Sequence, residues 1–524
     1  MGPAHSVIQI AIARALDNDD ELYAFPDEPF FEQDHVKRYN LDIKTYPIAV
    51  TYPTTTVQVS NIVKAAKANG LKVQGKCGGH SYANFGNPNG GIVVDLKNFQ
   101  KFEIDKATWE CKVGGGTLLG DLTKRMYEPH RRAMAHGTCP AVGIGGHATI
   151  GGLGPSSRLW GTALDHIKEV EIVVASGEVI RANEDQNSDI FWAVRGAGAS
   201  FGIITEFVVR SEAAPEKSVQ YSYAFAGKSW EDMAKTFRAW QDYVSQPDLT
   251  RAFASTATVT AAGLTISVTF YGTDEEFDKL KFKKNFPGNQ SEKTLVFDDY
   301  LGLVLHWAEE VALELISDIP AHTYTKTLTF DQCDRIPDLA IDKMFRYLEH
   351  ARKGTPIWFA IFDLAGGAVN DVDQNATAYA HRSALYYLQS YVVNPVGPVS
   401  NESKKFLKGL NKIIRDSMAE AGEPLDLGAY PGYVDLELGA GAQKAYWGTN
   451  LPRLESIKLT WDPEDVFSNP QSVRPEGKEL HSQPDVQPLK RGTLRSWLSM
   501  LTCFCGQYKA RQRSQRGDFK VKKS

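Results

Sequence analysis

The spacing of apolar residues changes repeatedly along the first 210 residues, which predicts a mixture of helices and strands. Apolar positions recur at helical spacing over residues 56–69, after a threonine-rich start suited to capping, so this segment is predicted to be a helix. The strand-like KVQGK at 72–76 and the apolar run GGIVVDL at 90–96 follow, and the second is expected to be a buried strand.

The next part of the chain continues this alternation. Residues 166–183 predict two strands that meet at a hairpin turn formed by Ser176 and Gly177. Residues 189–210 predict a helix, a glycine loop and a strand in that order. Short elements of both kinds, with glycine clusters between them, indicate an α+β fold.

Beyond residue 211 the glycine density drops and longer apolar segments take over. The predicted strands there are 250–260, 264–272 and 356–367, and the predicted helices are 300–317 and 383–393. We interpret this part as a second domain that faces a substrate. Residues 443–475 predict a helix followed by a closing loop that returns to the first domain.

The length of 524 residues is too great for one hydrophobic core, so two or three domains are expected. The expected segments are an N-terminal helical segment at 1–41, a first domain at 42–210, a second domain at 211–442, a C-terminal segment of the first domain at 443–475, and a tail at 476–524.

Composition narrows the class of protein. Hydrophobic residues make up 42% of the chain, charged residues 23%, and the formal net charge is −5, which is typical of a soluble enzyme and argues against nucleic acid as a partner. No run of eighteen apolar residues occurs, so no transmembrane helix is expected. The basic tail is predicted to be disordered. The alternative is a membrane-surface patch with an acylated Cys503 or Cys505.

The cysteines and the N-terminus leave the cellular compartment open. Six cysteines lie apart without a CxxC pair, which indicates neither a disulfide framework nor a metal site. The N-terminus is a poor secretory signal and is predicted to be a short helix. Glycosylation sequons at Asn289, Asn375 and Asn401 point weakly toward a secretory route.

Four glycine-rich loops lie between residues 75 and 202 and provide the main chemical signal. Their sequences are GKCGGHSY, GGGTLLG, VGIGGHATIGGLG and RGAGASFG. Backbone N–H groups can converge on phosphate where no Cβ obstructs the approach, so four loops together indicate a long ligand such as a dinucleotide. The chain has neither a Walker A motif nor a glycine motif that opens a Rossmann helix. Ordinary turns remain the alternative for each loop taken alone.

Three motifs carry a family resemblance. The sequences GGHSY at 78–82, GTCPAVGIGGH at 137–147 and YPGYVDLELG at 430–439 resemble the berberine bridge enzyme-like flavin oxidases of the vanillyl-alcohol oxidase superfamily. Within that family they are similar to the fungal glucooligosaccharide and chito-oligosaccharide oxidases. The resemblance covers about residues 39–475.

The resemblance implies a two-part PCMH-type FAD-binding domain, formed by 42–210 and completed by 443–475, and a substrate domain with an antiparallel sheet covered by helices. It implies FAD bound through two covalent bonds, one to His80 and one to Cys139. Further implied cofactor contacts are Gly78, Gly79, Ser81, Val142, Gly145, Gly146, His147, Gly151, Gly152, Gly202, Ile203, Tyr446 and Asn450. A purely structural role for His147, as for His136, stays open.

The resemblance also implies a catalytic pair. Tyr433 matches the family's base, which removes a hydroxyl proton from the substrate, and Asp363 matches its carboxylate partner. An unperturbed tyrosine has a pKa of about 10, so Tyr433 needs a nearby cation, a donated hydrogen bond or a carboxylate that accepts its proton. Without the flavin motifs, a core tyrosine and a strand-end aspartate would be the simpler interpretation.

The substrate positions match the carbohydrate oxidases in part. Tyr82, Tyr430, Gln389 and Ile361 are candidate substrate contacts. Ile361 stands where those oxidases have a glutamine, and Gly432 replaces an asparagine of the third motif. Loss of the amide at 361 makes a less polar alcohol or a secondary metabolite a serious competitor to an oligosaccharide.

We therefore expect a monomeric FAD-dependent oxidase without a metal, which takes hydride from a small-molecule alcohol and passes the electrons to O2 to give H2O2. Val142 corresponds to the family's oxygen gate, where valine accompanies reactivity with O2. The hydroxyl that reacts is the anomeric one if the substrate is a saccharide. A tailoring oxidase of secondary metabolism is the first alternative, and a flavin-bearing binding protein without turnover is the second.

Overall fold

The structure is a computed structural model that describes residues 6–226, 229–286, 291–315, 320–422 and 427–477. The predicted sequon at Asn289 and almost all of the predicted tail lie outside these residues.

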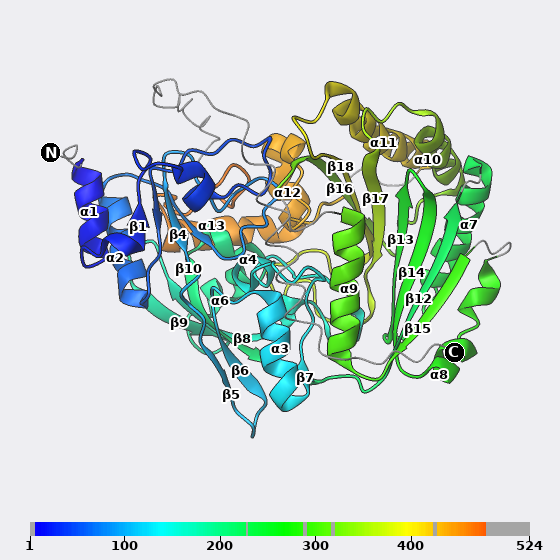
Figure 1. The fold of residues 1–524 in the computed structure, drawn as a ribbon, viewed down its shortest axis with the longest axis horizontal. Coiled ribbons are helices and arrows are strands. Elements are labelled where there is room, and N and C mark those ends of the chain that lie inside the picture. The colour runs from blue at the N-terminus through cyan, green and yellow to red at the C-terminus, as the bar shows by residue number, and fades with distance from the viewer. Residues whose placement is uncertain (1–5, 227–228, 287–290, 316–319, 423–426, 478–524) are drawn as a thin grey trace. The chain divides into compact units, whose positions relative to one another are not determined.

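The first sheet contains four strands in the order β1 (Tyr23–Ala24), β2 (Ala49–Thr51), β4 (Ile92–Asp95) and β3 (Val73–Lys76). Strands β2, β4 and β3 are parallel, and α2 (Thr56–Ala68) connects β2 to β3. Thr55 caps α2 by accepting a hydrogen bond from the Gln58 backbone N–H, in keeping with the predicted helix. The N-terminal helix α1 (Val7–Ala15) packs its buried face on α2 (Figure 1).

The second sheet is antiparallel and contains five strands. Their order is β5 (Phe102–Ile104), β6 (Glu110–Gly114), β10 (Ile203–Arg210), β8 (Ile167–Val173) and β9 (Val179–Asn183). The predicted hairpin joins β8 to β9, where Gly177 has φ +80°, a conformation that favours glycine. Helices α3 (Leu119–His130) and α6 (Ser188–Ala197) contribute to the core on this sheet.

The third sheet is antiparallel and contains seven strands. Their order is β15 (Ser291–Phe297), β12 (Ser218–Ala226), β14 (Gly263–Tyr271), β13 (Phe253–Thr260), β17 (Ile357–Leu364), β18 (Ala384–Asn394) and β16 (His322–Asp331). One face is covered by α7 (Trp230–Val244), α10 (Asp338–His350) and α11 (Asn401–Glu420), which share an apolar core with the strands (Figure 1).

Helix α9 (Tyr300–Leu315) lies on the other side of this sheet and connects it to α3. Tyr300 and Trp307 of α9 pack with Tyr127 of α3 and Tyr271 of β14 in one buried cluster. The rest of that sheet face can therefore form the wall of a site.

The remaining elements are short. The helices are α4 (Ile144–His147), α5 (Ser157–Trp160), α8 (Asp274–Lys279), α12 (Ala442–Trp447) and α13 (Leu451–Trp461), and the strands are β7 (Arg132–Ala133) and β11 (Glu212–Ala213). The single-turn helices are η1 (Asp20–Leu22), η2 (Glu32–Val36), η3 (Ala163–His166), η4 (Gly198–Ser200), η5 (Phe282–Asn285), η6 (Gly367–Val369), η7 (Leu436–Gly441) and η8 (Gly448–Asn450).

One predicted element is wrong. The segment 383–393 was expected to be a helix, but residues 384–394 form strand β18, which is paired on both sides by β16 and β17. Nearly every side chain of β18 is buried, because helices cover one face of the sheet and a cavity wall occupies the other. A strand buried on both faces loses the polar alternation that distinguishes it from a buried helix.

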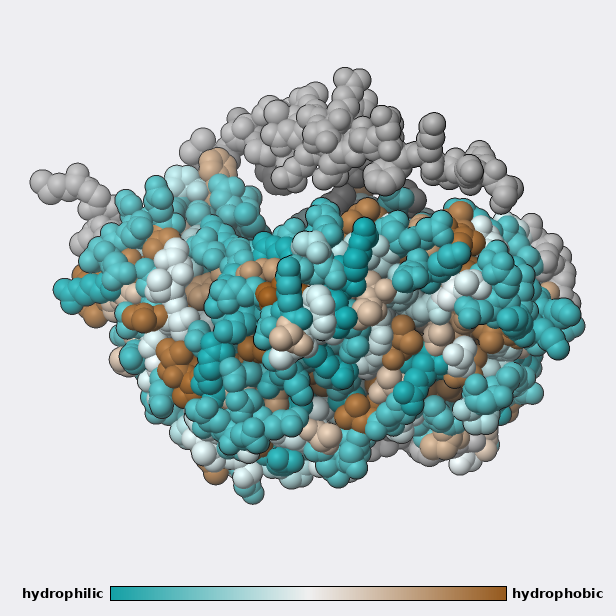
Figure 2. Space-filling model, turned by 90° about the horizontal axis from the view of Figure 1, so that it is seen from below, coloured by the Kyte–Doolittle hydropathy of each residue, from teal (hydrophilic) through white to brown (hydrophobic). Residues whose placement is uncertain are grey.

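No helix within the described ranges combines the length and apolar character needed to cross a bilayer. On the face in Figure 2, hydrophilic residues predominate and hydrophobic residues occur in small separate groups.

The C-terminal segment is held by a buried charge. The ammonium of Lys458 on α13 is fully buried and lies 2.6 Å from the Asp462 carboxylate. It also donates to the backbone carbonyls of Ser200 and Phe467, at 2.6 and 2.8 Å. This cation therefore links α13 to η4 beside β10.

We expect Lys458→Met to lower the free energy of unfolding by about 3–5 kcal/mol, because Asp462 would be left as an uncompensated buried charge. Urea unfolding followed by tryptophan fluorescence measures the loss. Lys343→Met, which removes an exposed pair with Glu420, is the control and should cost at most about 1 kcal/mol. Equal losses in the two variants would contradict the assigned role.

Candidate active site

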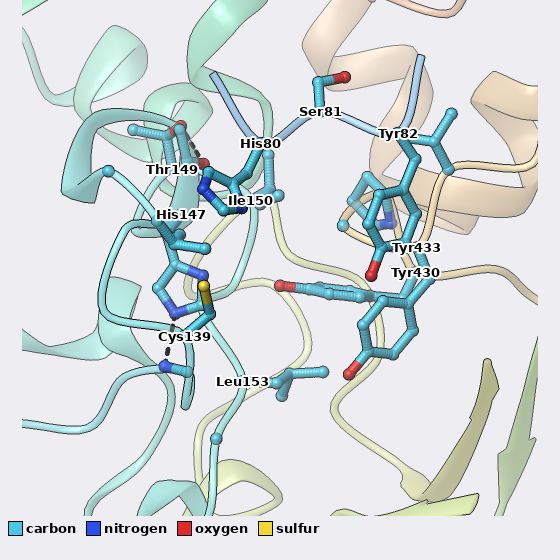
Figure 3. Close-up of a pocket in the computed structure, with 18 of the residues that line it drawn as sticks. His80, Ser81, Tyr82, Cys139, His147, Thr149, Ile150, Leu153, Tyr430 and Tyr433 are labelled. Atoms are coloured by element: carbon cyan, nitrogen blue, oxygen red, sulfur yellow. Dashed lines mark hydrogen bonds between the residues drawn. The ribbon is translucent and has the colours of Figure 1, made fainter. Parts of the chain in front are cut away.

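A cavity of about 560 Å³ lies between the glycine loops and the seven-stranded sheet. One wall consists of residues from the loops at 75–86, 137–154 and 197–204. The opposite wall consists of side chains from β12, β13, β14, β17 and β18 together with the segment 430–434. Figure 3 shows His80 and Cys139 on the loop side and Tyr430 and Tyr433 across from them.

The first and second motif loops approach each other closely because both contain glycine at the contact. A Cβ on Gly78 would lie 2.3 Å from the carbonyl oxygen of Ala141, and a Cβ on Gly143 would lie 2.2 Å from the sulfur of Cys77. Real side chains do not tolerate such distances. The two glycines thus allow the loops that carry His80 and Cys139 to meet at one cavity.

The loop side of the cavity fits a nucleotide cofactor. The side-chain Nε2 of Gln74 is buried, lines the cavity and has no hydrogen-bond partner among the described residues. Lys76 also lines the cavity and donates to the carbonyl of Val36 at 2.7 Å, and burial lowers the pKa of its ammonium to about 8. Backbone N–H groups, an unpartnered amide and a buried cation are suitable for a ligand with phosphates.

His147 supports the loop that carries Cys139. Its Nε2 accepts a hydrogen bond from the backbone N–H of Gly137 at 2.9 Å, and burial lowers its pKa to about 3, so the ring is neutral with its proton on Nδ1. His147 also lines the cavity. His136 instead lies outside the cavity lining, with its Nε2 2.8 Å from the Thr123 hydroxyl. Both histidines thus have a structural bond, and His147 has access to the cavity as well.

The structure brings Tyr433 and Asp363 together. The Tyr433 hydroxyl donates to Oδ2 of Asp363 at 2.9 Å, and Nε2 of Gln389 donates to the same oxygen at 2.6 Å. Asp363 comes from β17 and Gln389 from the paired strand β18, where Ile361 is the residue directly opposite Gln389.

Burial sets the protonation of this pair. Burial raises the pKa of Asp363 to about 6, and the hydrogen bonds donated by Tyr433 and Gln389 oppose a larger rise. Burial and the neighbouring Asp363 raise the pKa of Tyr433 well above its ordinary value, and Tyr430 and Tyr82 act in the same direction. On the sequence alone, a cation, a donated hydrogen bond or a carboxylate acceptor is expected to assist Tyr433 as a base. The structure provides the carboxylate acceptor, and no cation contributes among these described neighbours.

The four candidate substrate contacts all line the cavity. They are Tyr82, Ile361, Gln389 and Tyr430. The Tyr430 hydroxyl accepts a hydrogen bond from the Gly152 backbone N–H at 2.9 Å, and its ring contacts that of Tyr433 with centroids 5.0 Å apart. Tyr430 therefore also fixes the ring that carries the candidate base.

Most of the predicted cofactor contacts line the same cavity. They are Gly78, Gly79, His80, Ser81, Cys139, Val142, Gly145, Gly146, His147, Gly202, Ile203 and Tyr446.

Gly151, Gly152 and Asn450 do not line it. Gly152 holds Tyr430, and Gly151 packs so closely that a Cβ would lie 2.8 Å from the Tyr430 ring. The Asn450 amide donates to backbone carbonyls of residues 374, 377 and 378. These residues support the site from behind.

Sequence reasoning missed several residues of the cavity wall. Tyr39 lines it, with its ring 4.7 Å from that of His80 and stacked on that of Tyr82 at 6.1 Å. Gln74 and Gln471 also line it. The residues around these positions form no motif, and only the start of the family resemblance at residue 39 could have pointed to Tyr39.

The described residues contain neither a metal-ligand cluster nor a disulfide. No group of three or more histidine, cysteine, aspartate or glutamate side chains there is arranged to hold a metal ion. The four described cysteines are not joined by disulfides.

A cavity with glycine loops on one wall and an antiparallel sheet on the other is suited to a flavin, and comparisons with known proteins show that the class is that of flavin-dependent oxidoreductases. Residues 47–183 match the FAD binding domain family, and residues 429–474 match the family described as berberine and berberine like.

Whole-length relatives show the same enzyme class. The FAD-linked oxidoreductase sorD of Penicillium rubens is 36% identical over 477 residues, covering 90% of this chain and 99% of the relative. The chitooligosaccharide oxidase of Gibberella zeae is 30% identical, covering 83% of this chain and 89% of the relative. The glucooligosaccharide oxidase structure from Acremonium strictum, described with a 6-S-cysteinyl, 8α-N1-histidyl FAD, matches with a TM-score of 0.79 and 28% identity over 89% of this chain and 99% of that one.

The chain therefore belongs to the FAD-linked oxidoreductases that combine this FAD-binding domain with a berberine-like C-terminal segment. The α+β fold, the enzyme class and the FAD cofactor predicted from the sequence are confirmed.

We expect Gly143→Ala to lower the thermal midpoint by several degrees and to reduce the amount of flavin bound, because the new methyl group would separate the two motif loops. Differential scanning fluorimetry and the visible spectrum measure the two effects. Gly441→Ala, where a Cβ meets nothing within 4 Å, is the control. A Gly143→Ala protein as stable and as yellow as the control would show that the loop contact is dispensable.

Proposed function

We propose that the chain oxidises an alcohol, with FAD attached to both His80 and Cys139, Tyr433 as the base and O2 as the final acceptor. The observation that carries this proposal is the hydrogen bond from Tyr433 to Asp363 in a cavity that His80 and Cys139 also line. When bound, FAD supplies the hydride acceptor.

His80 and Cys139 are suited to hold the flavin from the loop side. Both line the cavity on the side of the glycine loops, and the Acremonium strictum oxidase is described with one histidyl and one cysteinyl attachment. His147 would keep the Cys139 loop in place through Gly137. Two attachments would fix the cofactor against the wall that carries Tyr433.

Tyr433 would take the hydroxyl proton of the substrate while its own proton moves to Asp363. This transfer requires an ionised Asp363, and a carboxylate with a pKa of about 6 is mostly ionised at neutral pH yet basic enough to accept a proton. Gln389 holds the carboxylate by its own hydrogen bond and so keeps the accepting oxygen toward Tyr433. The phenolate of Tyr433 therefore never has to persist in the buried site.

A saccharide oxidised at its anomeric hydroxyl is the first substrate candidate, because several relatives are oligosaccharide oxidases. A specific observation favours a second candidate, a less polar alcohol of secondary metabolism. Ile361 places an apolar side chain on the cavity wall beside Asp363, and Ile150 and Leu153 line the same cavity. Anaerobic bleaching of the flavin by a panel of sugars and lipophilic alcohols distinguishes the two.

Oxygen is the proposed acceptor because Val142, at the position of the family's oxygen gate, lines the cavity three residues after Cys139. A larger side chain there would narrow access to the cofactor from the second motif loop.

Covalent attachment predicts that the yellow colour stays with the protein after acid precipitation. Either single variant, His80→Ala or Cys139→Ala, should retain colour through the remaining bond, and the double variant should release it into the supernatant. Absorbance of the two fractions measures the outcome. Release from the wild-type protein would remove the covalent assignment and leave the fold unaffected.

Turnover should depend on Tyr433 and on ionised Asp363. Tyr433→Phe should lower kcat by about 10²–10⁴-fold, and wild-type kcat should fall as the pH drops through about 6, because protonated Asp363 can no longer accept a proton. Asp363→Asn should abolish this acidic limb. Stopped-flow flavin reduction with the best alcohol of the panel, from pH 5 to pH 9, provides the profile. A Tyr433→Phe enzyme with wild-type kcat would identify another base.

A further inference from the structure

The third motif contains a second buried acid that the proposed chemistry does not use. Asp435 follows Tyr433 by two residues and is only 1% exposed. Its Oδ2 lies 2.7 Å from the ammonium of Lys326 on β16, and its Oδ1 accepts the Glu437 backbone N–H at the start of η7. The Glu437 carboxylate lies 3.8 Å from the same ammonium.

The segment between Tyr433 and Asp435 is held on several sides. The Thr325 hydroxyl, next to Lys326 on β16, donates to the carbonyl of Val434. From the C-terminal segment, Nε2 of Gln471 donates to the backbone carbonyl of Asp435 at 2.7 Å.

Tyr446 completes this attachment. Its hydroxyl donates to Oε1 of Gln471 at 2.9 Å and accepts the backbone N–H of Asp435 at 3.4 Å. Tyr446 and Gln471 both line the cavity, so the attachment reaches the cofactor side. The Lys326–Asp435 pair is the charged link of this network to the seven-stranded sheet that also carries Asp363.

We propose that the Lys326–Asp435 ion pair positions Tyr433 against Asp363, so that Lys326 is a positioning residue for the proton transfer. This inference rests on the proposed function. Tyr433 is attached to a loop, whereas Asp363 is fixed on the interior strand β17, and the hydrogen bond between them needs both ends to be held. The ion pair holds the loop end to β16, two strands away in the same sheet.

Loss of Lys326 would act on Asp363 through Tyr433. A buried Asp435 without its cation would take up a proton or draw in water, and either change releases the segment that carries Tyr433. A longer Tyr433–Asp363 bond would stabilise the Asp363 carboxylate less. Because that bond opposes the effect of burial, the pKa of Asp363 would rise and the acidic limb of kcat would move to higher pH.

The two acids have separate sets of charged and titratable neighbours. Asp363 interacts with the phenols of Tyr433 and Tyr82 and with the amide of Gln389. Asp435 interacts with Lys326, Glu437, Tyr446 and Tyr324. Lys326 is not among the groups that act on Asp363. If the acidic limb of kcat shifts in a Lys326 variant, the shift would therefore have to come from a changed position of Tyr433.

The test compares kcat–pH profiles of full-length flavoproteins, with the alcohol that reduces the flavin fastest. Lys326→Met should move the acidic limb up by about half a pH unit or more and lower kcat at pH 7 by about tenfold, with KM within about twofold. Lys326→Arg, which keeps the cation, should restore the wild-type limb. Lys343→Met, which removes an exposed pair between α10 and α11, should match the wild type throughout.

A Lys326→Met enzyme that binds flavin and keeps the wild-type limb would overturn the inference and leave the proposed function intact. If the wild-type kcat–pH profile has no acidic limb, or has one that Asp363→Asn does not remove, both this inference and the proposed function would be overturned. If Lys326→Met does not accumulate as a flavoprotein, Asp435→Asn provides the same comparison, because the amide keeps an acceptor for the Glu437 N–H but loses the charge.

Discussion

The proposed chemistry depends on one buried carboxylate that must remain ionised. Asp363 lies on a central strand, without a cation among its described interacting neighbours, and is stabilised by two donated hydrogen bonds. Burial makes the carboxylate a better proton acceptor, and the two hydrogen bonds that it accepts favour its ionised form. In the proposed mechanism, the transfer of the Tyr433 proton to Asp363 depends on this balance between burial and hydrogen bonding.

The surrounding elements hold Asp363 and its two hydrogen-bond donors in place. Gln389 reaches Asp363 because β18 lies beside β17, and Tyr433 reaches it from a loop held by Tyr430 on one side and by Asp435 on the other. The glycine loops provide the facing wall. Their close contact at Gly78 and Gly143 brings His80 and Cys139 to the same cavity as the acid.

Much of this arrangement could be predicted from the sequence. The helix after β2, the hairpin between β8 and β9, and the strands β13, β14 and β17 follow from local periodicity and turn residues. The family resemblance predicted the FAD cofactor, and it identified Tyr433 and Asp363, which the structure brings together.

What could not be predicted depends on distant packing. Strand β18 was predicted as a helix because both of its faces are buried, and nothing local distinguishes such a strand. Gly151, Gly152 and Asn450 were expected to contact the cofactor but support the site from behind the cavity wall, while Tyr39 and Gln74 reach the cavity without any motif. Contacts between residues that are far apart in the sequence cannot be predicted from the local spacing of residue types.

An infrared difference spectrum between the oxidised enzyme and the enzyme reduced anaerobically by its alcohol measures the protonation of Asp363 directly. If the Tyr433 proton moves to Asp363, reduction should produce a new band from a protonated carboxyl group, and this band should be absent in Asp363→Asn. A spectrum without a carboxyl change, or one that Asp363→Asn leaves unaltered, would contradict the transfer of the proton to Asp363.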